Sequence, residues 1–217
     1  MKLKDGTTAA LRMVHVDNLA VCLRREALHA PNFVPADGEA WVAIHSVPVQ
    51  SRRARTMVAC GPGGSLHDYV PFYFGDRGPM LLNLHTNRVP GYTDGQAALG
   101  YLVVSVEEVA AAGHGFVFFD GHALASFSQA FDDLDALKQL DWPTIGARQW
   151  SDTADDPDRQ RRKQAEFLVH RQLPWSLVRG VAVMDQTRRQ QVESILAGFP
   201  SALHRPVAVV PKWYYLR

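Results

Sequence analysis

Short runs of apolar residues, separated by turns, dominate the chain and predict more strands than helices. One of these runs contains Pro71, and because proline cannot donate to a β-ladder, we expect it at a sheet edge or a kink. The expected strands are residues 13–16, 41–44, 69–74, 101–104, 116–119, 181–184, 207–210 and 213–215.

Capping residues and apolar spacing predict three helices. Asp17 or Asn18 should cap the first helix, because polar side chains of this kind accept hydrogen bonds from free backbone N–H groups. Ser105 begins a capping box for the second helix, and Asp185 caps a third that stops at Gly198. The apolar positions on one face of the first helix are Leu19, Cys22, Leu23 and Ala27.

The whole chain, residues 1–217, is predicted to form one α+β domain with a central mixed or antiparallel sheet. Residues 120–160 differ from the rest, since they are rich in aspartate and have few long apolar runs. A segment of this length without a core pattern is typical of an insertion or a functional loop.

Composition and charge exclude several classes of protein. Of 217 residues, 47% are hydrophobic and 21% are charged, which is typical of a globular protein with a core. The net charge of +1 provides no overall field that would mark a nucleic-acid or membrane partner. Two cysteines are too few for a disulfide framework. The first residues lack the apolar stretch of a signal peptide, and the apolar runs are too short to span a membrane. We therefore expect a soluble cytoplasmic protein with no membrane partner.

Common catalytic motifs are missing from the sequence. The nine histidines lack the short spacings of a zinc site, so no metal is expected. Neither a phosphate-binding glycine loop nor a serine nucleophile elbow is present.

His15 and Asn18 are the first candidate site residues, at the predicted junction of a strand and a helix. Polar side chains beside free N–H groups suit the binding of a carboxamide, a ribose or a phosphate. In isolation, an ordinary helix cap beside a half-buried histidine explains them better.

A cluster of three arginines, Arg52, Arg53 and Arg55, precedes the aromatic run at 69–74. Arginine next to aromatic residues can pair with phosphate and stack on flat rings, as in a dinucleotide or single-stranded nucleic-acid site. Alone, a solvated basic turn beside core aromatics is the better explanation.

Glu166 lies within the apolar stretch 164–169. A carboxylate there must be paired, protonated or functional. If the stretch is a strand, Glu166 shares a face with Leu168; if it is a helix, Glu166 pairs with Arg162 at i and i+4. The spacing leaves both alternatives open.

The segments that contain these residues, taken with several others in their order along the chain, resemble the DarT family of DNA ADP-ribosyltransferase toxins. Gly78 stands where the family more often has serine, so a small residue is kept. The matching segments are residues 15–19, 52–55, 68–74, 78–80, 140–142, 164–169 and 209–215.

The resemblance implies an ADP-ribosyltransferase fold, in which a split β-sheet with short flanking helices holds NAD in a central cleft. It implies that Glu166 and Arg53 are catalytic, with Arg52 as the second choice for the arginine. It implies NAD as co-substrate and no metal. The residues expected to contact NAD are His15, Asn18, Leu19, Arg53, Tyr69, Tyr73, Phe74 and Met80.

The implied acceptor is a base of single-stranded DNA, thymine in the commoner branch of the family. Watson–Crick pairing hides the reacting nitrogen in a duplex, so the base must be exposed. A substrate-recognition loop is expected around residues 120–163, and a macrodomain antitoxin is the expected protein partner. The residues expected to contact DNA are Arg52, Arg55, Arg148, Arg159 and Arg162.

Three alternatives remain open from the sequence. The enzyme could modify guanine instead of thymine, as one branch of the family does. It could transfer ADP-ribose to protein or RNA. It could also be an inactive relative that only binds nucleic acid, although the retained Glu166 and arginines argue against that.

Overall fold

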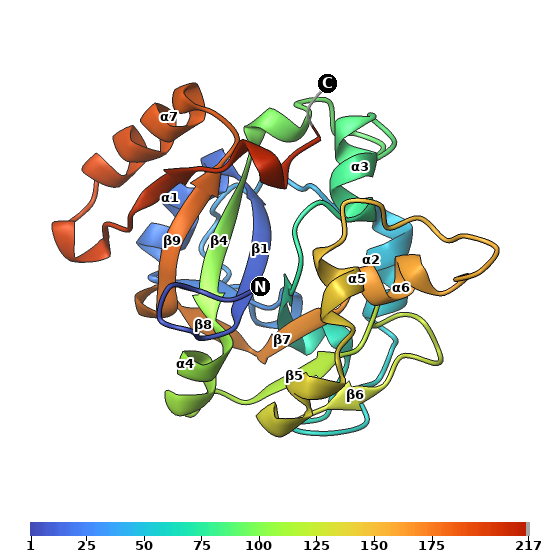
Figure 1. Ribbon diagram of the computed structural model, residues 1–217. Helices are drawn as coiled ribbons and strands as arrows, with labels where there is room; N and C mark the ends of the chain where they lie inside the picture. Colours follow the sequence, from blue (N-terminus) through green and yellow to red (C-terminus); the bar gives the residue numbers. More distant parts are fainter. Residues whose placement is uncertain (216–217) are drawn as a thin grey trace.

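The computed structural model describes residues 1–215, whose strands form an eight-stranded sheet and a two-stranded sheet (Figure 1). The large sheet has the order β10-β9-β4-β1-β3-β7-β5-β6, and the smaller one pairs β2 with β8. Neighbouring strands are antiparallel except β10 and β9, so the predicted α+β class with a mixed sheet is confirmed. The strands are β1 (Ala9–His15), β2 (Ala27–His29), β3 (Tyr69–Tyr73), β4 (Leu99–Ser105), β5 (Phe116–Phe119), β6 (Ala130–Phe131), β7 (Glu166–His170), β8 (Gln172–Pro174), β9 (Val178–Val183) and β10 (Val207–Val209).

Short helices surround the sheet, and the longest of those described is α7 (Figure 1). The α-helices are α1 (Leu19–Arg24), α2 (Val47–Arg53), α3 (Pro79–His85), α4 (Val106–Ala111), α5 (Trp142–Gly146), α6 (Arg159–Lys163) and α7 (Gln186–Ala197). The 3-10 helices are η1 (Val16–Asn18), η2 (Pro31–Phe33), η3 (Leu66–Asp68), η4 (Gln96–Ala98), η5 (Leu134–Gln139), η6 (Trp175–Leu177), η7 (Ser201–Leu203) and η8 (Pro211–Trp213). The domain predicted over 1–217 extends two residues past the described part.

The large sheet parts between β1 and β3. These strands pair at one position, Leu11 opposite Tyr73, whereas β1 pairs with β4 along its whole length. The Arg12 side chain lies where they diverge, and its Nη1 donates to the carbonyl oxygen of Pro71 at 3.0 Å. Pro71 therefore lies at an edge inside the sheet, where the missing N–H has no backbone partner to lose.

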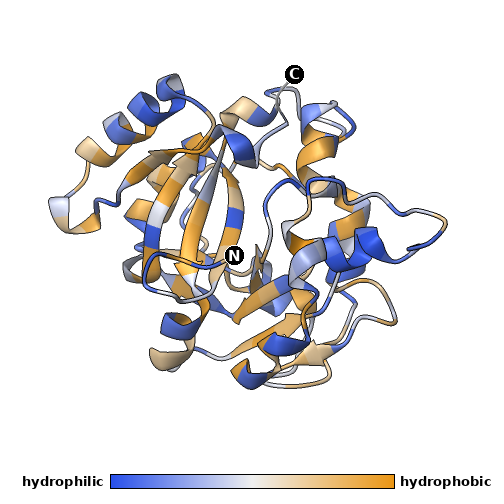
Figure 2. Ribbon diagram, viewed as in Figure 1, coloured by the Kyte–Doolittle hydropathy of each residue, from blue (hydrophilic) through white to orange (hydrophobic). Residues whose placement is uncertain are grey.

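The strands of the sheet are rich in apolar residues, as their orange colour in Figure 2 shows, and their side chains pack in core clusters on both faces. Along β7, Phe167 packs in the core cluster that contains Phe72, whereas Leu168 packs on the other face with Tyr69. Side chains alternate between faces along a strand, so Glu166 shares the face of Leu168. The strand interpretation of this stretch is thereby confirmed.

Two predicted caps are confirmed. Asp185 accepts a hydrogen bond from the backbone N–H of Arg188, and α7 ends just before Gly198. The hydroxyl of Ser105 accepts from the N–H of Glu108 and begins α4.

Other local predictions are wrong. Asn18 does not cap α1 through its side chain, which instead bonds the backbone of Val42. Helix α1 ends at Arg24 because Glu26 takes a left-handed conformation (φ 49°), and Ala27 then begins β2. Residues 41–44 form no strand, and the end of the chain forms η8 in place of the strand expected at 213–215. Both segments are β-prone but have no strand beside them to pair with.

Candidate active site

Glu166 and Arg53 form a buried ion pair, although they are far apart in the sequence. The Nη1 of Arg53 donates to the Oε2 of Glu166 at 2.8 Å, and the backbone N–H of Ala123 donates to the Oε1 at 3.0 Å. Glu166 is fully buried and Arg53 nearly so. The alternative partner, Arg162, does not reach Glu166 and instead binds Asp141, Asp156 and Asp158.

The local structure explains how the pair forms. Glu166 begins β7 opposite Tyr73 of β3 and Phe119 of β5, so two neighbouring strands fix its position. Arg53 is the last residue of α2, whose first turn contains Pro48, a favourable residue at that place. Burial acts to lower the pKa of Arg53, but the charges of Glu166 and Tyr73 and the hydrogen bond to Glu166 together outweigh it and raise the pKa above its ordinary value. The guanidinium of Arg53 is therefore charged at neutral pH.

A cavity of about 530 Å³ lies beside this pair. Four of the predicted NAD contacts line it: Asn18, Arg53, Tyr73 and Met80. Its volume is in the range of a small-molecule site. The Nη2 of Arg53 is buried without a hydrogen-bond partner among residues 1–215, so one donor of the guanidinium remains available for a ligand.

The other predicted NAD contacts do not line this cavity. Phe74 packs in the core against Phe118 and Trp142, and the Tyr69 hydroxyl donates to the carbonyl oxygen of Gly63. Both were expected in the cleft from the family resemblance. Phe74 faces the opposite side from Tyr73, because neighbouring residues of a strand alternate, whereas Tyr69 shares the face of Tyr73 but lies at the other end of β3. The prediction for these two is therefore corrected, and Tyr73 is the member of the run that faces the cavity.

His15 and Leu19 lie behind the cavity wall formed by Asn18. Leu19 is part of the core, and His15 is 5% exposed. The His15 Nε2 lies 3.3 Å from a carboxylate oxygen of Asp94. The His15 Nδ1 accepts from the N–H of Asp17, so this histidine, and not Asn18, caps the turn after β1.

The polar residues of the cavity that the sequence analysis did not identify include Gln50, His67 and His122. His122 precedes Ala123, whose N–H holds Glu166. Burial lowers the pKa of His122, and the charges of Arg53 and Arg52 lower it further while Glu166 opposes them. His122 follows shortly after the predicted strand that ends at Phe119, and Phe119 pairs with Glu166 in the sheet. This position after a strand was the one signal in the sequence that pointed to His122.

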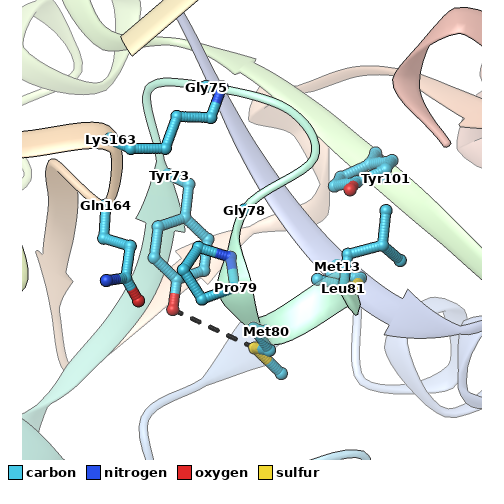
Figure 3. Close-up of a pocket in the computed structure, with 10 residues that line it drawn as sticks. All are labelled: Met13, Tyr73, Gly75, Gly78, Pro79, Met80, Leu81, Tyr101, Lys163 and Gln164. Carbon is cyan, nitrogen blue, oxygen red and sulfur yellow. Dashed lines mark hydrogen bonds between the residues drawn. The ribbon is translucent and has the colours of Figure 1, made fainter. Parts of the chain in front are cut away.

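A smaller recess of about 10 Å³ adjoins the cavity (Figure 3). Tyr73, Met80 and Gln164 line both the recess and the cavity. Its back wall includes Lys163, which is 2% exposed. The Lys163 Nζ donates to the carbonyl oxygens of residues 145 and 147, at 2.7 and 3.1 Å. Burial lowers its pKa to about 8. This lysine ties the segment after α5 to the wall of the recess.

The five arginines expected to contact DNA differ in their surroundings. Arg52, Arg55 and Arg148 are exposed, Arg159 is half-buried, and none of them forms an ion pair within residues 1–215. Arg162 is held by three aspartates and is not available for phosphate, so this prediction is corrected. The missed signal was the density of aspartates in the same segment.

Residues 1–215 contain neither a metal-binding cluster nor a membrane-spanning helix. No group of three or more His, Cys, Asp or Glu side chains is placed to hold a metal ion. None of the helices there has the length and apolar character to cross a membrane.

Comparison with known proteins relates the chain to one family. A family model described as "ssDNA thymidine ADP-ribosyltransferase, DarT" matches residues 11–215. A DNA ADP-ribosyl transferase of Thermus sp. (strain 2.9) is 40% identical over 208 residues, which cover 96% of each chain.

Solved structures agree in fold. Thermus sp. 2.9 DarT in complex with ADP-ribosylated ssDNA superimposes with a TM-score of 0.90 at 38% identity, and the match covers 99% of each chain. The same protein in complex with NAD+ gives a TM-score of 0.86 at 37% identity, covering 99% of this chain and 100% of that one. A Thermosipho africanus DarTG in complex with ADP-ribose shares the fold at 16% identity, with a TM-score of 0.77 over 96% of this chain and 51% of that one. The split-sheet fold expected from the resemblance is confirmed.

Proposed function

The chain belongs to the DarT family, and we propose that it transfers ADP-ribose from NAD to thymine in single-stranded DNA through the cavity at Arg53 and Glu166. The single observation that carries the proposal is the buried Arg53–Glu166 pair beside a cavity of about 530 Å³. The relatives are DNA ADP-ribosyl transferases, and solved relatives hold NAD+ and ADP-ribosylated ssDNA.

In the transfer, the bond between nicotinamide and the ribose C1′ breaks and a bond from a ring nitrogen of thymine to C1′ forms. The nicotinamide leaves with the bonding electrons, and the proton of the thymine nitrogen is released. Positive charge develops on the ribose as the bond breaks, as in glycoside hydrolysis. We assign its stabilisation to the Glu166 carboxylate, which is held ready by the N–H of Ala123.

Arg53 has a second task in this proposal. It pairs with the buried Glu166 side chain, and its free Nη2 can bind a phosphate of NAD or a carbonyl of the base. Asn18, Tyr73 and Met80 are proposed as NAD contacts because they line the cavity. His15 and Leu19 are proposed to support the Asn18 turn from behind, since they lie outside the cavity wall.

The single domain of residues 1–217 is proposed to carry its recognition loop around 120–163. The side chains proposed to bind DNA phosphates are Arg52, Arg55, Arg148 and Arg159, which form no ion pair in the described part of the chain. Contacts with phosphates position the DNA strand, whereas contacts with the bases determine which sequence is recognised.

The direct test mixes the protein with NAD and short oligonucleotides that carry one thymine, one guanine or neither. Mass spectrometry should find one added ADP-ribose on the single-stranded thymine oligonucleotide. The same oligonucleotide in a duplex should be labelled at least ~10-fold more slowly, because pairing hides the ring nitrogen. Labelling of guanine alone, of protein alone, or of duplex and single strand equally would contradict the proposal.

We also propose that the protein is a toxin of the cytoplasm, countered by a macrodomain antitoxin. The support is family membership and the fold shared with a DarTG bound to ADP-ribose. Expression in a host cell should stop growth, and co-expression of an ADP-ribose-removing macrodomain should restore it. Growth unaffected by the active enzyme would contradict a toxin.

A further inference from the structure

We propose that Gln50 and His67 form a pair that selects acceptor bases with the carbonyl group that thymine carries at C4, and not the amino group that cytosine carries there. This inference rests on the proposed function and adds the basis of its specificity. Both side chains line the cavity, on the same wall as Arg53.

Gln50 and Arg53 are three residues apart on α2, so they lie on one face of the helix and both reach the cavity. His67 belongs to η3, just before β3. The His67 Nε2 lies 3.1 Å from the Oε1 of Gln50. An amide oxygen only accepts, so the His67 Nε2 must carry the proton and donate it.

This contact fixes which way the Gln50 amide points. The oxygen is taken up by His67, and the amide nitrogen donates to none of the residues described here. Burial lowers the pKa of His67, and the charges of Arg53 and His45 lower it further. A neutral His67 has one N–H, which is the one that holds Gln50. The pair therefore presents an N–H donor to the cavity.

A fixed donor distinguishes the bases. Thymine carries carbonyl oxygens on both sides of its ring N–H, and guanine carries one beside its ring N–H. Cytosine shares the C2 carbonyl of thymine but carries an amino group, itself a donor, in place of the C4 carbonyl, and adenine carries an amino group at the corresponding C6. A carbonyl accepts from Gln50, whereas an amino group leaves two donors facing each other and both unsatisfied.

The position of the pair favours the base over nicotinamide as its ligand. At the ribose carbon, the attacking nitrogen must approach from the side opposite the leaving nicotinamide. Of the proposed NAD contacts, Asn18 follows β1 on the other side of the split in the sheet, and Tyr73 is the last residue of β3, whereas His67 precedes the first residue of β3. The acceptor base is thus expected on the His67 side.

The test compares wild type with Gln50→Glu, which replaces the donor by an acceptor of the same size. Gln190→Glu, an equal change at an exposed position of α7, is the matched control. Single-stranded oligonucleotides with the same flanks carry one thymine, deoxyuridine or cytosine. We expect wild type and Gln190→Glu to label thymine and deoxyuridine at least 10-fold faster than cytosine. In Gln50→Glu, thymine labelling should fall at least 10-fold and the preference over cytosine should disappear, with NAD affinity within about twofold of wild type. His67→Phe, which removes the bond that orients the amide, should also reduce the preference.

Each other outcome has a definite meaning. A Gln50→Glu enzyme that keeps the wild-type preference overturns the inference. A loss of NAD affinity that parallels the loss of transfer also overturns it, because the amide would then bind nicotinamide. If wild type labels none of the oligonucleotides, the proposed function itself fails, and the specificity inference fails with it.

Discussion

At the scale of single residues, the two carboxylate oxygens of Glu166 have different partners, one a guanidinium and one a backbone N–H. Glutamine at this position keeps an oxygen acceptor of the same shape but loses the negative charge. Alanine would leave Arg53 buried and unpaired, which costs about 3–5 kcal/mol in such pairs. The glutamine variant therefore separates charge from packing.

We predict that Glu166→Gln slows DNA labelling at least ~100-fold, because the developing positive charge on the ribose loses its stabilising carboxylate. Its free energy of unfolding should fall by only about 1–3 kcal/mol. Mass spectrometry of the oligonucleotide and urea denaturation measure the two effects. Wild-type labelling by this variant would remove Glu166 from the catalytic role.

Arg159 and Arg162 should behave differently when each is replaced by glutamine. Arg159 has no ion pair in residues 1–215, so its loss should reduce the salt dependence of DNA binding by about one charge without changing stability. Arg162 holds three aspartates, so its loss should cost about 1 kcal/mol of stability and leave the salt slope unchanged. Binding measured from 50 to 300 mM salt (roughly the range in which phosphate contacts are resolved) decides between them. Identical salt slopes for the two variants would contradict this assignment.

His122 should make stability depend on pH. Its pKa is lowered in the folded protein by burial, so the unfolded chain binds a proton more readily. The free energy of unfolding should therefore be fully present above the ordinary histidine pKa and decrease as the pH falls below it, by at most about 1.4 kcal/mol per pH unit for one group. Denaturation of wild type and His122→Asn should be measured at one pH above the ordinary histidine pKa and at one pH below it. The free energy of unfolding should decrease less in the variant. Equal decreases would show that His122 titrates normally.

At the scale of elements, the sequence predicted some parts well for identifiable reasons. Strand β5 and helix α7 follow from an apolar run and from a cap with helical spacing. The role of Asn18 could not be predicted, because its partner Val42 is distant in the sequence and lies in an irregular segment. The pairing of Glu166 likewise required a partner from α2, whereas the sequence offered Arg162 nearby.

In the candidate site, too, the sequence could not predict which distant residues come together. Chemistry-bearing residues within recognisable blocks, such as Arg53 and Glu166, could be identified by resemblance. Gln50 and His67 could not, because single polar residues outside a motif become visible only when the fold places them on one cavity.

The segment after α5 should loosen when Lys163 is replaced by methionine. The carbonyl oxygens of Ile145 and Ala147 then lose their donor, and Asp76, 3.8 Å from the Nζ, loses its nearest cation. We expect about 1–3 kcal/mol of lost stability, faster hydrogen exchange at 144–150 and a higher KM for DNA.

Lys138→Met, on the exposed side of η5, is the control and should change none of these measures. Unchanged exchange at 144–150 in Lys163→Met would show that other contacts hold the segment.

At the scale of the molecule, the end of the described chain ties separate parts together. The Tyr214 hydroxyl donates to the carbonyl oxygen of Leu99 in β4, and the Tyr215 hydroxyl bonds the loop before α3. Trp150, from the segment after α5, donates to the same Tyr215 hydroxyl. The two halves of the split sheet and the proposed recognition loop are thus linked far from the reacting atoms.

The divergence of β1 and β3 has a consequence for redesign. One side chain, Arg12, bridges the gap to Pro71 and also lines the cavity, so it acts as a spacer whose length sets how far the strands stand apart at that point. Shortening it would enlarge the free space at that point while the other wall residues keep their identity. Enzymes that accept bulkier bases can therefore be sought by changing this spacer before any residue of the reaction centre is altered.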